Sequence, residues 1–204
     1  MQIWHVLQSC AAELLPCRVK SSACETQTFL LIPHTVRDLA ELAASPDRYL
    51  VSVDAEPERA AKVWFERAAR NPFGGDGCVQ IRYFETQLIP LELWDDTVEI
   101  WIALLDAMEG FLATGAGHGN FSAEISLVGN GYGARFSAHG VAHRVDPLEL
   151  IPAVLGGAQR YFSWTHDMVG HSYPEIFERI QTMTASLNSF SPTRAVTKES
   201  HPRA

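Results

Sequence analysis

The sequence predicts a single α+β domain, with a mixed or antiparallel sheet of about six strands and helices packed mainly on one face. Two adjacent patterns carry this prediction. Between residues 94 and 112, apolar residues recur at steps of three and four, which is the spacing of one face of a helix. From residue 121 onward the apolar and polar residues alternate, and Asn130-Gly131 is typical of a type I′ hairpin turn. We therefore expect a long helix, a loop over residues 115–119 and a three-stranded meander over residues 121–145.

The helix expected between Trp94 and Leu112 should be buried on more than one side. Its main apolar stripe, with the residues that widen it, consists of Trp94, Val98, Trp101, Ile102, Leu104, Leu105, Met108, Phe111 and Leu112. Asp95 and Asp96 stand at its start, where carboxylates interact favourably with the helix dipole. Gly115 is a typical helix end. Five acidic residues along this helix argue against a membrane-spanning segment.

The register of the meander is predicted from its first turn. With Asn130 and Gly131 at the centre, the paired residues are Leu127 with Ala134, Ile125 with Phe136, and Ala123 with Ala138. These six residues are apolar and share one face, whereas Ser126 lies opposite Arg135 on the other. A second tight turn at His139-Gly140 would start a third strand. Its inward residues are expected to be Val141, His143 and Val145.

Five further elements are expected before the central helix. Strands are predicted at 26–32, 49–53 and 79–83, and helices at 35–44 and 57–70. Thr35 is the expected cap of the first helix, and Pro57 suits the first position of the second. The side of the second helix that carries Trp64, Phe65 and Ala68 is expected to be buried.

Two helices are expected after the meander. The first of them has three start signals: Asp146 as the cap, Pro147 at the first position and Glu149 at the third. Pro152 conflicts with a straight helix because it has no backbone donor, so this helix either kinks there or begins later. A capping box around Pro174 begins the last amphipathic helix. Its apolar positions are Ile176, Ile180, Met183 and Leu187.

The two ends of the chain differ from its centre. The domain is expected to span residues 1–188, although residues 1–24 have no clear pattern and their attachment to the core is left open. Residues 189–204 are polar and aperiodic, which predicts a disordered tail. The N-terminus lacks the features of a signal peptide. The four cysteines form no C-x-x-C pair, so we expect free thiols and a cytoplasmic protein.

Charge and motifs exclude several functions. A net charge of −8 argues against nucleic acid as a partner and is compatible with a basic protein partner. The glycine-rich loops at 74–77 and 129–133 match neither a P-loop nor a dinucleotide fingerprint, and the sequence contains no G-x-S-x-G motif. We therefore expect no cofactor and assign no catalytic residue.

The alternative to a binding protein is a metal-dependent enzyme built on His166, Asp167 and His171. Two imidazoles and a carboxylate within six residues could hold a divalent cation. However, the spacing of five residues does not place both histidines on one helical face, and a polar loop between two helices explains the segment equally well. His143, on an apolar sheet face, is interpreted as a structural histidine.

Residues 94–164 combine an acidic amphipathic helix, a polar-faced hairpin, a capped helix and the aromatic segment Tyr161-Phe162-Ser163-Trp164. This order resembles small acidic α+β immunity proteins of bacterial polymorphic toxin systems. The resemblance implies a non-catalytic cytoplasmic protein that binds and neutralises a partner toxin.

The outer face and tip of the hairpin are the candidate binding surface. Its residues are Ser122, Glu124, Ser126, Tyr132 and Arg135. Tyr132 is included because aromatic residues are frequent at binding hot spots. A self-associating structural protein is the third interpretation.

Overall fold

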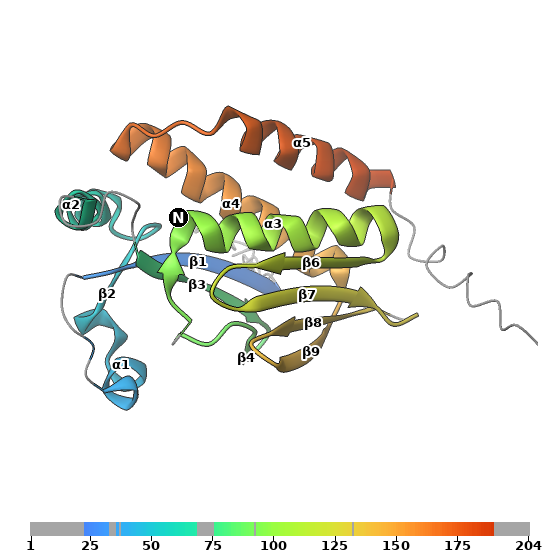
Figure 1. The fold of residues 1–204 in the computed structure, drawn as a ribbon, viewed down its shortest axis with the longest axis horizontal. Helices are drawn as coiled ribbons and strands as arrows, with labels where there is room; N and C mark the ends of the chain where they lie inside the picture. The colour runs from blue at the N-terminus through green and yellow to red at the C-terminus, as the bar shows by residue number, and fades with distance from the viewer. Residues whose placement is uncertain are drawn as a thin grey trace, which may run out of the picture.

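The computed structural model describes residues 23–32, 36, 38–68, 76–91, 93–131 and 133–189, which form an α+β fold (Figure 1). The predicted fold class is confirmed. The strands are divided between a five-stranded and a four-stranded antiparallel sheet, here sheets A and B, instead of one sheet of about six strands. Residues 1–22 of the predicted domain lie outside the described residues. The predicted tail was to begin at Ser189, which is instead the last residue of the final helix, and the rest of the tail lies outside the described residues.

Sheet A has the strand order β2-β1-β3-β4, and β5 pairs with the start of β3. Its elements and the helices beside it are β1 (Cys24–Leu31), α1 (Leu39–Ala44), β2 (Leu50–Ser52), α2 (Pro57–Ala68), β3 (Asp76–Tyr83), β4 (Thr86–Gln87) and β5 (Asp95–Asp96). Burial alternates along β1, because one of its faces packs under helix α4 (Pro147–Trp164). On the opposite face, α1 covers one end of the sheet through a small cluster that includes Leu42 and Cys78.

Two expectations about the first helices are wrong. Helix α1 begins at Leu39 rather than near Thr35, because the Asp38 side chain accepts a hydrogen bond from the Ala40 backbone N–H at 2.8 Å and caps the helix there. Thr35 itself lies outside the described residues. In α2, Trp64 is buried as expected, but Phe65 is 54% exposed. Adjacent helical positions point about 100° apart, so one buried face cannot hold both rings.

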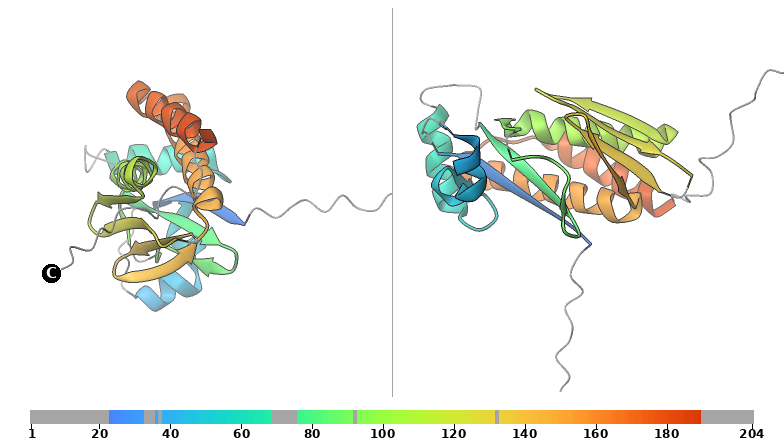
Figure 2. Two further views of the ribbon diagram at one scale, coloured as in Figure 1. Left: turned by 90° about the vertical axis from the view of Figure 1, so that its right-hand side faces the viewer. Right: turned by 90° about the horizontal axis from the view of Figure 1, so that it is seen from below.

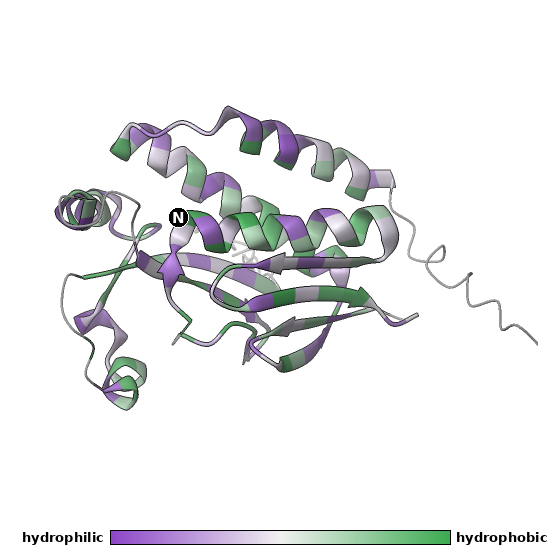
Figure 3. Cartoon of the chain, in the orientation of Figure 1, coloured by the Kyte–Doolittle hydropathy of each residue, from purple (hydrophilic) through white to green (hydrophobic). Residues whose placement is uncertain are grey.

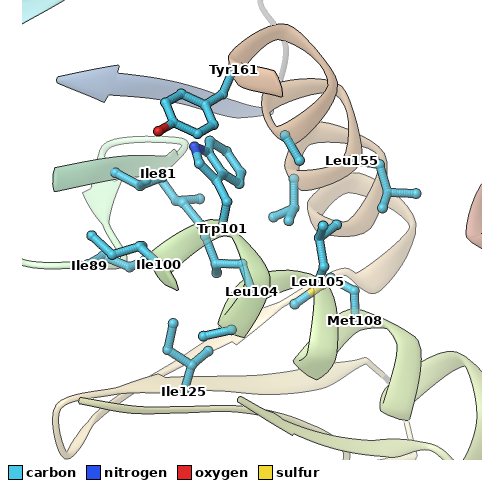
Figure 4. Packing of buried hydrophobic residues seen from close by; sticks show 14 of the residues in the cluster. Ile81, Ile89, Ile100, Trp101, Leu104, Leu105, Met108, Ile125, Leu155 and Tyr161 are labelled. Carbon is cyan, nitrogen blue, oxygen red and sulfur yellow. The ribbon is translucent and has the colours of Figure 1, made fainter. Parts of the chain in front are cut away.

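Helix α3 (Thr97–Thr114) is the centre of the molecule and agrees with the predicted helix. Asp96 caps it by accepting from the Val98 N–H at 2.8 Å, and Gly115 ends it with a φ of +83°. Its residues pack against α4, helix α5 (Pro174–Ser189) and both sheets. Figure 4 shows Trp101 and Leu104 projecting into the core around α3. Burial on several sides explains why hydrophobic residues predominate along α3 in Figure 3.

Strand β6 (Ala116–Asn120) occupies the segment that was expected to be a loop. Its inward residues are glycines, so the alternation that indicates a strand is missing from its sequence. A Cβ atom on Gly119 would lie 1.8 Å from the Ala103 carbonyl oxygen, and one on Gly117 would lie 1.9 Å from that of Ala107. Glycine therefore lets the backbone of β6 lie directly on α3.

Sheet B has the order β6-β7-β8-β9, with β7 (Glu124–Gly129), β8 (Ala134–Ala138) and β9 (Val141–Val145). The predicted register is wrong by two residues, since Leu127 pairs with Phe136 and Ile125 with Ala138. The connection has four residues, 130–133, closed by the Asn130 N–H donating to the Gly133 carbonyl oxygen at 3.1 Å. A shift of two residues preserves both faces of the sheet, so the core was predicted correctly although the pairs were not.

The second turn of the meander forms as predicted. His139 and Gly140 connect β8 and β9 with φ values of +49° and +76°. On β9, Val145 is buried, but Val141 is 48% exposed because it lies at the end of an edge strand. His143 is half-buried and pairs with Phe136.

Helices α4 and α5 (Pro174–Ser189) pack together beside α3 (Figures 1 and 2). Asp146 caps α4, which begins at Pro147 and continues through Pro152, so of the two alternatives left open by Pro152 the later start is excluded. The predicted apolar face of α5 is confirmed by Ile176, Ile180 and Met183, which are buried. None of the helices that the structure describes combines the length and apolar character needed to cross a bilayer.

A few hydrogen-bonded polar groups connect the buried surfaces of these elements. The Trp101 indole N–H donates to Thr28 Oγ1 at 3.1 Å, and the Thr97 and Tyr161 hydroxyls lie 2.6 Å apart. Every buried side-chain polar atom in the described residues has a hydrogen-bond partner. The core therefore contains polar contacts without the penalty of an unsatisfied group.

Candidate functional site

One face of sheet B packs against the core. The other face is turned away from α3, and we call it the outer face. The outer face consists of Ala116, His118, Asn120, Glu124, Ser126, Val128, Arg135, Ser137, Ala142 and Arg144. Its charged residues are exposed, whereas Ser126, Val128 and Ser137 near its centre are half-buried. Because β6 is held directly on α3, this face is a rigid platform rather than a loop surface.

The pairing of the strands sets the order of side chains across the outer face. One row runs Ala116, Val128, Arg135, Arg144, and the next runs His118, Ser126, Ser137, Ala142. Glu124 lies on the far side of the second row, and its Oε1 is 3.6 Å from His118 Nδ1. The acid and the two arginines therefore occupy opposite ends of the face.

The two arginines face each other without a carboxylate between them. Arg135 of β8 is directly opposite Arg144 of β9, and neither forms an ion pair with a carboxylate of the described residues. Glu124 is four residues along β7 from Val128, which is about 13 Å at the rise of a β-strand. Asp146, two residues after Arg144, caps α4. With two arginines against this one nearby carboxylate, this end of the outer face has an excess of positive charge, although the chain as a whole is negative.

Three of the five predicted binding residues share this face: Glu124, Ser126 and Arg135. Ser122 does not, because it lies in the turn before β7, where its backbone N–H donates to Asp95 Oδ2 at 3.0 Å. Ser126 is opposite Ser137 rather than Arg135. Tyr132 lies outside the described residues.

His118, Ser137 and Arg144 belong to the same face but were not singled out from the sequence. His118 was missed because the sequence of β6 lacks the alternation that indicates a strand. The alternation of polar and apolar residues in the meander would have placed the other two on the outer face, had both faces been considered.

The residues of the alternative metal site lie at the C-terminal end of α4, next to α2. His166 and Asp167 are exposed in a single π-helical turn, Thr165–Val169, and His171 follows Gly170, whose φ is +81°. The imidazole of His171 lies edge-on to Trp64, with ring centroids 6.0 Å apart. In the described part of the chain, no three His, Cys, Asp or Glu residues come close enough together to hold a metal ion. The structure therefore does not assemble His166, Asp167 and His171 into a ligand set.

A groove of about 560 Å³ runs between β1 and α4, lined by residues that include Glu25, Asp54, Glu149 and Arg160. A second hollow of about 480 Å³ shares Asp54 and Arg160 with it. The Arg160 guanidinium is occupied, since it donates to Asp54 Oδ1 at 2.9 Å and to the Thr26 carbonyl oxygen at 2.8 Å. It therefore joins α4 to sheet A and is not available to a ligand without breaking that link.

Cys24 is the one thiol among the residues that line the 560 Å³ groove. Burial, with smaller contributions from Glu149 and Glu25, raises the pKa of Cys24 to about 12. The thiolate is the reactive form of cysteine, so this thiol is protonated and a poor nucleophile near neutral pH. The outer face of sheet B remains the stronger candidate.

No known protein family, no curated protein and no solved structure matches this chain. The resemblance of residues 94–164 to immunity proteins therefore stays a prediction. The geometry of the outer face is the main guide to function.

Proposed function

We propose that this chain is a binding protein whose protein partner docks on the outer face of sheet B. The observation that carries the proposal is the contrast between the two faces of this sheet. Its inner face, with Ile125, Leu127 and Phe136, is fully buried against the core, while its outer face presents charged and hydroxyl side chains on the same rigid strands. Exposed polar groups held by a rigid scaffold are well suited to specific recognition.

The shape of this face favours a protein over a small molecule. Small-molecule sites are concave and bury most of their ligand, whereas protein interfaces are broad and flatter. Four strands of about five residues cover roughly 300 Å², at a rise of about 3.3 Å and a strand spacing of about 4.8 Å. A standard interface covers about 800 Å² on each partner. The partner must therefore also contact the loops around the face, such as His139-Gly140.

The narrower form of the proposal is an immunity-type protein that neutralises a toxin in the cytoplasm. Its support is the resemblance of residues 94–164 and the absence of a recognised catalytic motif in the sequence. Co-expression tests this form: a toxic protein encoded beside this chain should lose its toxicity when the chain is present. Undiminished toxicity of such neighbours would contradict the immunity role and leave the binding role to be tested by itself.

Site-specific photocrosslinking tests the binding role in the cells that encode the protein. A photoreactive residue at Ser126, in central strand β7, should trap a discrete protein. The matched control is Gln80, a half-buried polar residue of central strand β3 on the face of sheet A that is turned away from α4. The proposal predicts an adduct from position 126 that position 80 does not give. Equal adducts from both positions, or none from 126, would contradict it, and an adduct with a second copy of this chain would support self-association instead.

A further inference from the structure

We propose that the outer face recognises an acidic segment of its partner, with partner carboxylates bound between Arg135 and Arg144. This inference rests on the proposed function and adds the chemistry of the partner surface. An acidic partner surface differs from the basic partner that the net charge of −8 suggests.

Most arginines within the described residues have an internal counter-ion. Six of the eight form ion pairs: Arg48 with Glu41, Arg59 with Glu56, Arg67 with Asp76, Arg82 with Glu25, Arg160 with Asp54, and Arg179 with Asp106 and Glu109. The remaining two are Arg135 and Arg144, and they are directly opposite each other on adjacent strands. The two arginines that lack an internal counter-ion are thus the two that repel each other.

This arrangement of Arg135 and Arg144 is unfavourable in the free protein. Directly opposite residues in an antiparallel pair have Cβ atoms about 4.5–5.5 Å apart, and like charges there are destabilising. A carboxylate placed between two guanidinium groups removes that repulsion and can accept paired hydrogen bonds from each fork. Binding of an acidic group would therefore relieve an unfavourable feature of the free protein as well as form new contacts.

The arginine pair carries two positive charges, and the nearest carboxylate along its own strands is Asp146, two residues after Arg144. Its Oδ1 accepts from the Leu148 N–H at 2.9 Å and caps α4, so it is held at the helix end and balances at most one of the two charges. Glu124, the acid of the outer face, is about 13 Å away along the strands and lies next to His118. Charges are screened over about 8–10 Å at moderate ionic strength, so the charge at the contact matters more than the net charge of the chain. Val128, half-buried in the same row, provides an apolar neighbour for the stem of a Glu or Asp side chain.

A protein carboxylate fits this site better than a nucleic acid. Nucleic-acid binding depends on many cations that neutralise successive phosphates. The outer face has two arginines and also carries Glu124, which would repel a continuous phosphate backbone. An acidic protein segment can place its carboxylates at the arginine end alone and leave the Glu124 end to another contact.

NMR titration of the full chain with model ligands tests the inference before the natural partner is identified. The probes are a hexaglutamate peptide, a hexaglutamine peptide and inorganic phosphate, and the signals are the Nε–Hε resonances of the arginines. We expect hexaglutamate to shift the resonances of Arg135 and Arg144 in a saturable manner and hexaglutamine to leave them unchanged. Arg48 and Arg82, which are exposed but paired, are the internal controls and should shift much less.

Three results would overturn the inference. They are no shift with hexaglutamate, equal shifts at Arg48 and Arg82, and a response to phosphate that matches or exceeds the response to the peptide. The variant Arg135→Gln/Arg144→Gln should abolish the shift of the neighbouring backbone amides in β8. Photocrosslinking at Ser126 separates the two proposals. If Ser126 gives an adduct but hexaglutamate does not shift Arg135 and Arg144, the acidic partner segment is refuted while the binding role of the outer face is supported.

Discussion

At the scale of single residues, small side chains determine how closely the elements approach. Gly157 of α4 lies over Thr26 and Trp101, and a Cβ atom there would be 2.3 Å from Thr26 Oγ1 and 2.6 Å from Trp101 Cη2. Neither neighbour can move freely, since Thr26 donates to the Ala153 carbonyl oxygen and Trp101 to Thr28. The next residue along the helix toward its start, Gly156, has only the far end of Arg160 nearby, at 3.7 Å.

These adjacent glycines give a matched pair of predictions in one helix. Gly157→Ala should destabilise the protein by about 3 kcal/mol because overpacking displaces the core. Gly156→Ala should instead stabilise it by about 0.5–1 kcal/mol through the higher helix propensity of alanine. Urea unfolding of both variants measures the two changes, and equal effects would show that α4 does not press on Thr26 and Trp101 as described.

The buried thiol of Cys78 predicts a dependence of stability on alkaline pH. Burial raises the pKa of Cys78 from 9.0 to about 12. The unfolded chain therefore releases this proton near pH 9 while the folded chain keeps it, so stability falls as the pH rises above 9. Between pH 8 and pH 10 the native chain should lose about 1 kcal/mol more than Cys78→Ala. The measurement is urea unfolding at both pH values, and parallel losses in the two proteins would contradict the prediction.

At the scale of elements, the sequence is most informative where the signal is local. Helix α3 could be predicted because its apolar period, the cap Asp96 and the stop Gly115 all lie within a single stretch. Strand β6 could not be predicted. Its inward positions, 117 and 119, must be glycine because they lie against the backbone of α3, so the sequence of β6 shows no alternation of apolar and polar residues. The hairpin register was missed because Asn130-Gly131 can belong to a two-residue or a four-residue connection, and both keep the same apolar face.

The turn between β8 and β9 leads to a prediction about that hairpin. His139 has a φ of +49°, which costs energy for a residue with a Cβ atom, whereas Gly140 at +76° has no such cost. Gly140→Ala should destabilise the protein by about 1–2 kcal/mol, while His139→Asn should stabilise it slightly, because asparagine tolerates this conformation better. Thermal unfolding measures both, and a neutral Gly140→Ala would argue against a positive φ at residue 140.

The charge pairs of the two sheets give a second prediction at this scale. Arg144 is opposite Arg135, but Arg82 is opposite Glu25 with which it forms an ion pair. Arg144→Glu should therefore stabilise the free protein by about 0.5–1 kcal/mol, and Arg82→Glu should destabilise it by a similar amount. Urea unfolding at low salt measures both effects, and high salt should reduce them. A destabilised Arg144→Glu would contradict the repulsion between the two arginines.

At the scale of the whole molecule, α3 organises two sheets and two helices around one core. The α+β class and the residues of the meander core could be predicted from the sequence. The division into two sheets could not, because it depends on contacts between segments far apart in the chain, such as β1 with β3. The sequence pointed to Glu124, Ser126 and Arg135. Arg144, which with Arg135 gives the outer face its local charge, could have been found from the alternation along β9, but only the inward residues of that strand were considered.

If a protein partner docks on the outer face of sheet B, a bulky residue at the centre of this face must lower the affinity for the purified partner. Ser126→Trp places a bulky residue at the centre of this face, and Gln80→Trp does the same on sheet A. We predict that Ser126→Trp raises Kd by about 100-fold or more with an unchanged unfolding midpoint, while Gln80→Trp binds like the native chain. Native-like binding by Ser126→Trp would show that the partner does not dock on the outer face of sheet B.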